Sequence, residues 1–133
     1  MTTTTGRFDI TSWDEEVIDD DTDGAEGAKL VRARNTKSFE GGITGTSAAE
    51  LLQAMAGEGT ATYVAIARVT AAVDGRKGAF VLRHSALMAG GGGDMKVDVV
   101  PNSGTGELAG LTGVLTIAMS EAGEHTYSFD YDL

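Results

Sequence analysis

Apolar and polar residues alternate along most of the chain, and this period of two predicts β-strands rather than amphipathic helices. The clearest strands cover residues 60–73 and 77–88, with Asp74-Gly75-Arg76 between them. Asp-Gly between two alternating segments is typical of a tight β-hairpin turn. We therefore predict a hairpin here. Its interior face carries Tyr63, Ala65, Ala67, Val69 and Ala71 on the first strand and Phe80, Leu82, His84, Ala86 and Met88 on the second.

The chain closes with a strictly amphipathic strand over residues 125–133. One face is polar, and the other carries His125, Tyr127, Phe129, Tyr131 and Leu133. Shorter alternating segments predict further strands over residues 7–12, 29–40, 95–100 and 115–119. In the first of these, Phe8, Ile10 and Ser12 share a face. In the second, Asn35 and Lys37 share a face with Val31, Ala33 and Phe39, and the pattern does not decide which face is inside.

Residues 42–55 allow two interpretations. Ser47-Ala-Ala-Glu50 fits a capping box, and the five residues that follow favour a short helix. Alternation from Ile43 to Ala49, between clear strands, favours an extended segment instead. The residues alone leave both interpretations open.

Together these segments give about eight strands. Nineteen glycines against one proline fit many tight turns. Eight is the number at which a closed sheet has an interior that side chains can fill or that can hold one small ligand. The predicted fold is therefore all-β, a single closed antiparallel β-barrel of about eight strands.

Length, charge and composition narrow the class of protein. A chain of 133 residues fits one domain, in which residues 1–28 form an N-terminal strand and an acidic loop. No apolar segment is long enough to span a membrane, and the N-terminus lacks the features of a secretory signal, so we expect a cytoplasmic protein. A net charge of -10 with scattered basic residues disfavours nucleic acid as a partner. The lack of cysteine excludes disulfides, Fe-S clusters, thiolate zinc sites and a cysteine nucleophile.

Two motifs resemble known ligand sites but lack their context. Gly104-Thr-Gly106-Glu-Leu-Ala109 has the letters of a dinucleotide fingerprint, but Pro101 precedes it and no crossover helix follows, so a turn at the barrel rim is expected. Asp19, Asp21 and Asp23 have the opening spacing of an EF-hand, but Leu30 stands where the last ligand belongs. We expect neither a nucleotide site nor a specific calcium site, and the acidic stretch is predicted to be a solvated turn.

Two polar residues are candidates for chemistry. His84 follows Phe80 and Leu82 on one strand face, which suits either a ligand-facing or a hydrogen-bonded core histidine. Glu107 lies in a glycine-rich turn, where its carboxylate could reach the barrel mouth or serve as a turn residue. His84 and His125 are the only histidines and lack the spacing of a helical zinc site, so no metal centre is expected. The candidate walls of a pocket are Tyr63, Phe80, Leu82, Met88, His125, Tyr127, Phe129 and Tyr131, each of which also suits a packed core.

Several segments resemble an uncharacterised bacterial domain-of-unknown-function family, which looks like an allene oxide cyclase-type barrel. They are residues 39–45, residues 75–80, His84, residues 99–111, and His125 with Tyr127. The resemblance begins at about Lys29 and is most specific in Ser-Gly-Thr-Gly-Glu-Leu. It implies an eight-stranded barrel in which residues 42–55 are largely extended. It also implies an acidic residue where Ala67 stands, so a lumen carboxylate is missing here.

Relatives of this architecture share a lipophilic lumen and need no cofactor, and they often self-associate. We therefore expect a barrel that binds a small hydrophobic molecule, either as a cofactor-independent isomerase or cyclase using His84 and Glu107, or as a carrier without catalysis. The remaining hypothesis is a filled barrel that acts only as a self-associating homo-oligomer. Fold alone does not decide among them.

Overall fold

The computed structural model describes residues 1–20, 27–57, 59–90 and 92–133. The part of the acidic stretch that holds Asp21 and Asp23 lies outside these residues. Over the described chain the strands are β1 (Thr2–Asp20), β2 (Lys29–Gly41), β3 (Ile43–Met55), β4 (Ala61–Val73), β5 (Arg76–Ala89), β6 (Gly92–Val99), β7 (Thr112–Met119) and β8 (His125–Asp132), with a 3-10 turn, η1 (Gly106–Leu108), before β7.

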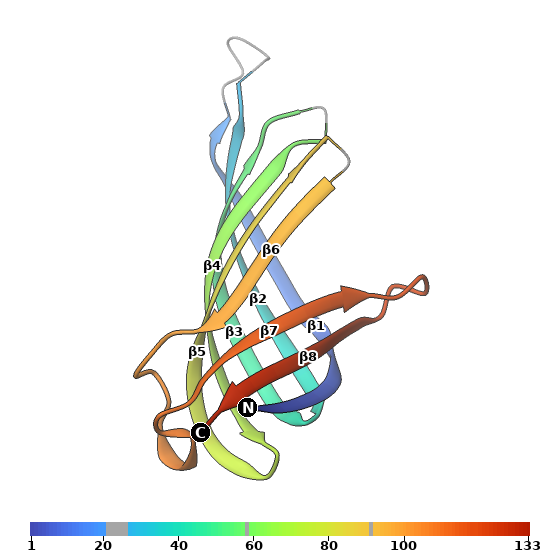
Figure 1. Cartoon of the computed structure of the whole chain (residues 1–133). Coiled ribbons are helices and arrows are strands. Elements are labelled where there is room, and N and C mark those ends of the chain that lie inside the picture. The colour runs from blue at the N-terminus through green and yellow to red at the C-terminus, as the bar shows by residue number, and fades with distance from the viewer. Residues whose placement is uncertain (21–26, 58, 91) are drawn as a thin grey trace.

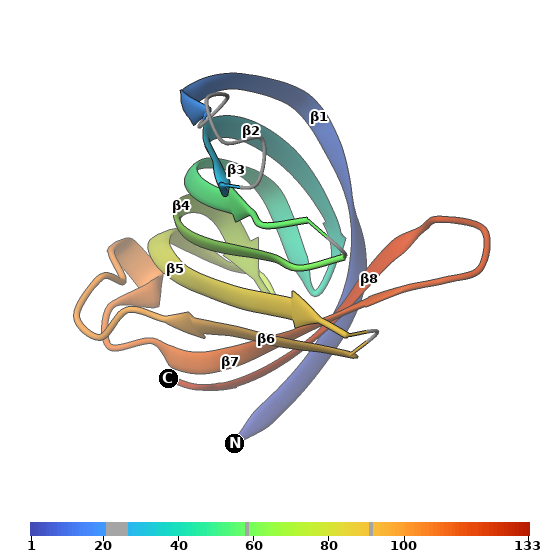
Figure 2. The same cartoon turned by 90° about the horizontal axis from the view of Figure 1, so that it is seen from above.

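The eight strands form a closed antiparallel barrel in sequence order, which confirms the predicted fold class (Figures 1 and 2). Closure comes from β1, which pairs with β2 on one side and with β8 on the other. The hairpin at Asp74-Gly75 is confirmed, and both turn residues adopt positive φ. Within the described residues, no helix is long and apolar enough to cross a membrane.

Residues 43–55 are extended throughout, as the family resemblance implied and against the capping-box interpretation. β3 pairs with β2 and with β4 along almost its whole length. Alternate side chains, including Ile43, Ser47 and Leu51, are buried. Burial of this inner face, together with pairing to a strand on each side, outweighs the local helix propensity, which is worth only tenths of a kcal/mol per residue.

A β-bulge in β1 changes which of its side chains face the interior. The register with β2 shifts between Ile10 and Ser12. Ser12 therefore hydrogen-bonds Thr36 on the outer face, and Trp13 lies opposite the buried Asn35. The simple alternation that placed Ser12 with Phe8 and Ile10 was wrong beyond Ile10, because a bulge inserts one extra residue.

One end of the barrel, which we call the filled end, is packed with large side chains. It carries the β2–β3 and β4–β5 turns and the loop with η1, at the bottom of Figure 1. Phe80 and Phe129 stack across its interior with ring centroids 6.1 Å apart. Leu108 and Leu111 from the loop are fully buried and close it from below. Large buried side chains therefore fill the interior at this end.

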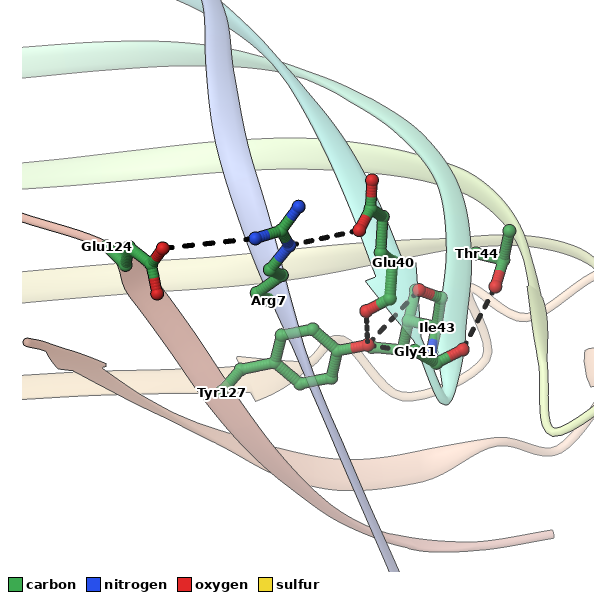
Figure 3. A network of polar contacts seen from close by, with 7 residues as sticks. All are labelled: Arg7, Glu40, Gly41, Ile43, Thr44, Glu124 and Tyr127. Atoms are coloured by element: carbon green, nitrogen blue, oxygen red, sulfur yellow. Dashed lines mark hydrogen bonds and ion pairs between the residues drawn. The ribbon is translucent and has the colours of Figure 1, made fainter.

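The hydroxyl group of Tyr127 on β8 makes hydrogen bonds with the backbone of the β2–β3 turn at the filled end. The hydroxyl accepts a hydrogen bond from the backbone N–H of Ile43 at 2.8 Å and faces the carbonyls of Glu40 at 2.8 Å and Ile43 at 3.1 Å (Figure 3). Above it, Arg7 pairs with Glu40 at 3.0 Å and approaches Glu124 at 4.0 Å. The contacts join β8 to the β2–β3 turn.

The opposite end, which we call the upper end, is less tightly closed. Among the described residues, the ladder between β6 and β7 holds a single pair, Asp98 with Val114. Above this pair the β7–β8 hairpin diverges from β6 (Figure 1). The upper part of β6 is paired continuously with β5, but among the described residues it has no ladder with β7 on its other side.

Candidate functional site

A cavity of about 170 Å³ occupies the upper half of the barrel interior. All eight strands contribute to its walls. Its lining residues are Phe8, Ile10, Trp13, Asn35, Lys37, Ala49, Leu51, Gln53, Tyr63, Ala65, His84, Met95, Ile117 and His125.

Small inward-facing side chains explain why this half is hollow. Ala49 of β3 and Ala65 of β4 are buried on the inner face and line the cavity. Ala65 lies directly opposite His84 in the β4–β5 ladder, so the imidazole borders the space that the methyl group leaves. The two small side chains therefore leave part of the interior unfilled at this level.

Three buried polar atoms in the cavity wall have no hydrogen-bond partner among the described residues. They are Asn35 Oδ1, Gln53 Oε1 and His84 Nε2. The residues Asn35 and His84 are only 5% and 4% exposed. Unsatisfied buried polar groups cost free energy and are rare, and their concentration in one cavity points to a polar ligand group or ordered water there.

His84 is neutral at physiological pH. Burial, aided by the positive charge of Lys37, lowers the pKa of its imidazole to about 4. A neutral imidazole carries one N–H and one lone pair on its ring nitrogens. His84 can therefore offer a ligand either a hydrogen-bond donor or an acceptor at Nε2.

Two further titratable side chains in the wall are shifted by desolvation. Burial lowers the pKa of the Lys37 ammonium, and burial raises the pKa of the Tyr63 hydroxyl. Both side chains are partly buried in the cavity wall. Both shifts reflect the same cause, since removal from water penalises the charged form of each group.

The structure brings together only some of the residues that the sequence suggested for a pocket. His84, Tyr63 and His125 line the cavity, and His125 stacks on Phe8 with a centroid distance of 4.9 Å. Met88 follows the inner alternation but is 58% exposed, because β5 extends past the enclosed part of the barrel. The remaining candidates are buried at or towards the filled end, outside the cavity lining: Phe80, Leu82, Tyr127, Phe129 and Tyr131.

Glu107 is not placed with His84. Its side chain is exposed in η1, and Oε1 accepts a hydrogen bond from the backbone N–H of Lys77 at 3.0 Å. Lys77 and His84 are seven residues apart on β5, which corresponds to about 23 Å of strand. The carboxylate therefore serves as a turn residue at the filled end, and the two groups cannot act on one ligand.

Sequence reasoning missed four lining side chains with polar groups: Trp13, Asn35, Lys37 and Gln53. The signal for Asn35 and Lys37 was present, since both alternate with Val31, Ala33 and Phe39, and polar residues on an otherwise apolar face suggest a ligand-facing surface. Trp13 could be assigned to the cavity only once the bulge in β1 was known. Gln53 could be assigned to it only once residues 43–55 were known to form a strand.

The fold and cavity define this protein as a closed eight-stranded antiparallel barrel with a partly polar cavity in its interior. The sequence matches the family described as "Protein of unknown function (DUF3224)" over residues 4–131, and the chain belongs to that family. It is similar to the crystal structure of a DUF3224 protein of unknown function from Shewanella oneidensis MR-1. The two share 38% sequence identity with a TM-score of 0.89, over 100% of this chain and 97% of the other. Among curated proteins, none matches the chain.

Proposed function

We propose that this barrel binds a small, mostly apolar molecule in the upper cavity. The observation that carries the proposal is the set of three unpartnered polar atoms, on Asn35, Gln53 and His84, in an otherwise largely apolar lining. An apolar body would fill the space between Phe8, Leu51 and Ile117, while a polar group would satisfy the buried atoms. Pockets for small molecules typically combine apolar walls with a few such polar groups.

The weak seam between β6 and β7 supports an entry route. Met95 of β6 and Ile117 of β7 both line the cavity, so it reaches the place where these strands diverge. Met95 is 49% exposed, and its flexible side chain can move aside at little cost. A ligand could therefore enter without breaking a continuous β-ladder.

The test measures binding of benzyl alcohol, whose ring suits the cavity and whose hydroxyl can donate to Asn35 or Gln53. A cavity of about 150 Å³ is enough to hold a benzene ring. Calorimetry and the fluorescence of Trp13, the one tryptophan in the sequence, would report binding. We expect saturable binding to the wild-type protein, loss in Ala65→Phe, which fills the cavity, and retention in Ser85→Phe, which adds the same ring to an exposed position on β5. Absence of saturable wild-type binding, or equal binding by both variants, would reject the proposal.

Catalysis in the same cavity would take the form of cofactor-independent isomerisation or cyclisation. The supporting observation is the neutral His84 at the wall, because a hydrogen bond from an imidazole can stabilise negative charge that develops on a substrate oxygen. Recovery of a co-purified ligand that is chemically unchanged after incubation would favour a carrier instead. Conversion that His84→Gln abolishes while the fold persists would favour an enzyme.

Self-association is a second candidate function, favoured by an apolar patch on the outside of the barrel. Leu52, Val64, Ile66 and Leu87 are each about half exposed on β3, β4 and β5. Arg83 and Glu50 border this patch, and each is already paired within the chain, Arg83 with Asp98 at 2.8 Å and Glu50 with Arg34 at 2.7 Å. A second copy related by a two-fold axis could therefore cover the apolar patch without burying an unpaired charge. Light scattering of the wild-type protein and Val64→Asp would test it: an oligomer that the aspartate dissociates is expected, and a wild-type monomer would exclude it.

A further inference from the structure

Lys37 places an ammonium group at the cavity. It lies on the inner face of β2 between Asn35 and Phe39, and its Nζ is 4.8 Å from the centroid of the Phe8 ring. An aromatic face attracts a cation but leaves its charge uncompensated. The charge therefore remains available to a ligand.

No carboxylate neutralises this ammonium among the described residues. Lys37 takes part in none of the ion pairs within 4.0 Å, and the cavity lining includes neither aspartate nor glutamate. Glu15, further along β1, directs its carboxylate to Trp13 Nε1 at 3.1 Å. The cavity is thus locally positive within a chain whose net charge is -10.

The pKa shifts of Lys37 and His84 are consistent with an ammonium group that has no counter-charge. Burial lowers the pKa of Lys37, and the charge of Lys37 adds to burial in lowering the pKa of His84. Both effects arise because positive charge is held away from water without a counter-charge. A bound anion would raise the pKa values of both side chains, because it would supply the missing counter-charge.

We propose that the cavity binds a small organic monoanion, such as an aromatic carboxylate, with its negative charge at Lys37 and its ring against the apolar wall. The proposal rests on the proposed function above and names its ligand class. The unpartnered oxygens of Asn35 and Gln53 repel a carboxylate, so the charged end of the ligand is expected at Lys37 and not beside them. These oxygens can instead accept a hydrogen bond from an uncharged N–H or O–H group elsewhere on the ligand. His84, when its proton is on Nε2, donates a second hydrogen bond.

The volume of the cavity limits the size of the anion that it can hold. A volume of about 170 Å³ is close to that of a cavity that holds one benzene ring, which is about 150 Å³. One ring with a single acidic group fits this space, whereas a long acyl chain would have to extend through the seam between β6 and β7.

The test compares benzoate with benzyl alcohol, which share a ring and differ in charge. Calorimetry would measure both dissociation constants for the wild-type protein, Lys37→Met and Lys96→Met. Lys96 is exposed on β6, so its loss changes the net charge equally without touching the cavity. Lys37→Gln provides a second substitution, and circular dichroism confirms that each variant is folded.

We expect the wild-type protein and Lys96→Met to bind benzoate about tenfold or more tightly than benzyl alcohol, as a charge-assisted contact implies. Lys37→Met should lose this preference, so that its dissociation constants for benzoate and benzyl alcohol become similar. Benzyl alcohol binding without a benzoate preference, or a preference that survives both Lys37 substitutions, would overturn the inference and leave the proposed function standing. Failure of both probes to bind would overturn both.

Discussion

The hydroxyl of Tyr127 on β8 accepts a hydrogen bond from the backbone N–H of Ile43 at the start of β3, over 2.8 Å. The two residues are 84 positions apart in sequence, and the contact lies in the buried filled end. A single hydroxyl therefore joins the last strand of the barrel to the turn that precedes the third. This relationship explains why Tyr127 belongs to the architecture and not to the cavity.

Tyr127→Phe should destabilise the protein by about 1–3 kcal/mol, because the buried Ile43 N–H would lose its acceptor. Urea unfolding would measure the loss. Tyr63→Phe is the matched control, since the Tyr63 hydroxyl has no hydrogen bond within the described part of the chain, and it should cost less. Equal losses in the two variants would show that the contact with Ile43 contributes nothing.

Gly6→Ala should destabilise the same region by about 1–3 kcal/mol. A Cβ at position 6 would collide with the Glu40 carbonyl and with the Tyr127 hydroxyl, and the carbonyl belongs to a paired strand that cannot easily move. Gly92→Ala, where a Cβ meets only one atom at 3.9 Å, should stay within about 0.5 kcal/mol of the wild type. Thermal unfolding of both variants would check the contrast, and an unchanged melting temperature in Gly6→Ala would contradict it.

His84 should make folding stability depend on pH between about 4 and 6.5. Its pKa is about 4 in the folded protein and near 6.5 in the unfolded chain. The unfolded state therefore binds more protons in this window, so this contribution, about 3 kcal/mol, is present above pH 6.5 and is lost as pH falls towards 4.

Urea unfolding at pH 7.5 and 4.5 would test this prediction with His84→Gln as the comparison. Lys37, Tyr63 and His125 also line the cavity, and they are present in both proteins, so the difference isolates His84. The variant should lose less stability on acidification than the wild type. An NMR titration of the His84 ring with a midpoint near 6.5 would refute the buried, neutral state.

Glu107→Gln should leave benzyl alcohol binding unchanged, because its carboxylate caps the backbone of Lys77 at the filled end. His84→Gln should weaken binding, since its side chain borders the cavity. Calorimetry on the two variants would compare them directly. A loss of binding in Glu107→Gln, with the fold intact, would mean that η1 influences the cavity from a distance.

The alternation of side chains was sufficient to predict the strands and the barrel, because it is a local property of extended backbone. The hairpin at Asp74-Gly75 and the amphipathic strand that ends the chain are both present. Alternation also identified the inner faces of β4, β5 and β8, where Tyr63, His84 and His125 reach the cavity.

Tertiary structure decided the rest. Pairing on both sides made residues 43–55 a strand, and a bulge at residues 10–12 turned Trp13 inward. The strand and the bulge both depend on pairing with neighbouring strands, and the local sequence carries no information about that pairing. The sequence also did not show at which end of the barrel an inward-facing side chain lies. Phe129 and His125 belong to the same alternating face of β8, yet Phe129 lies in the filled end and His125 lines the cavity. Which side chains share a level of the barrel depends on the stagger between strands, and closure alone fixes that stagger.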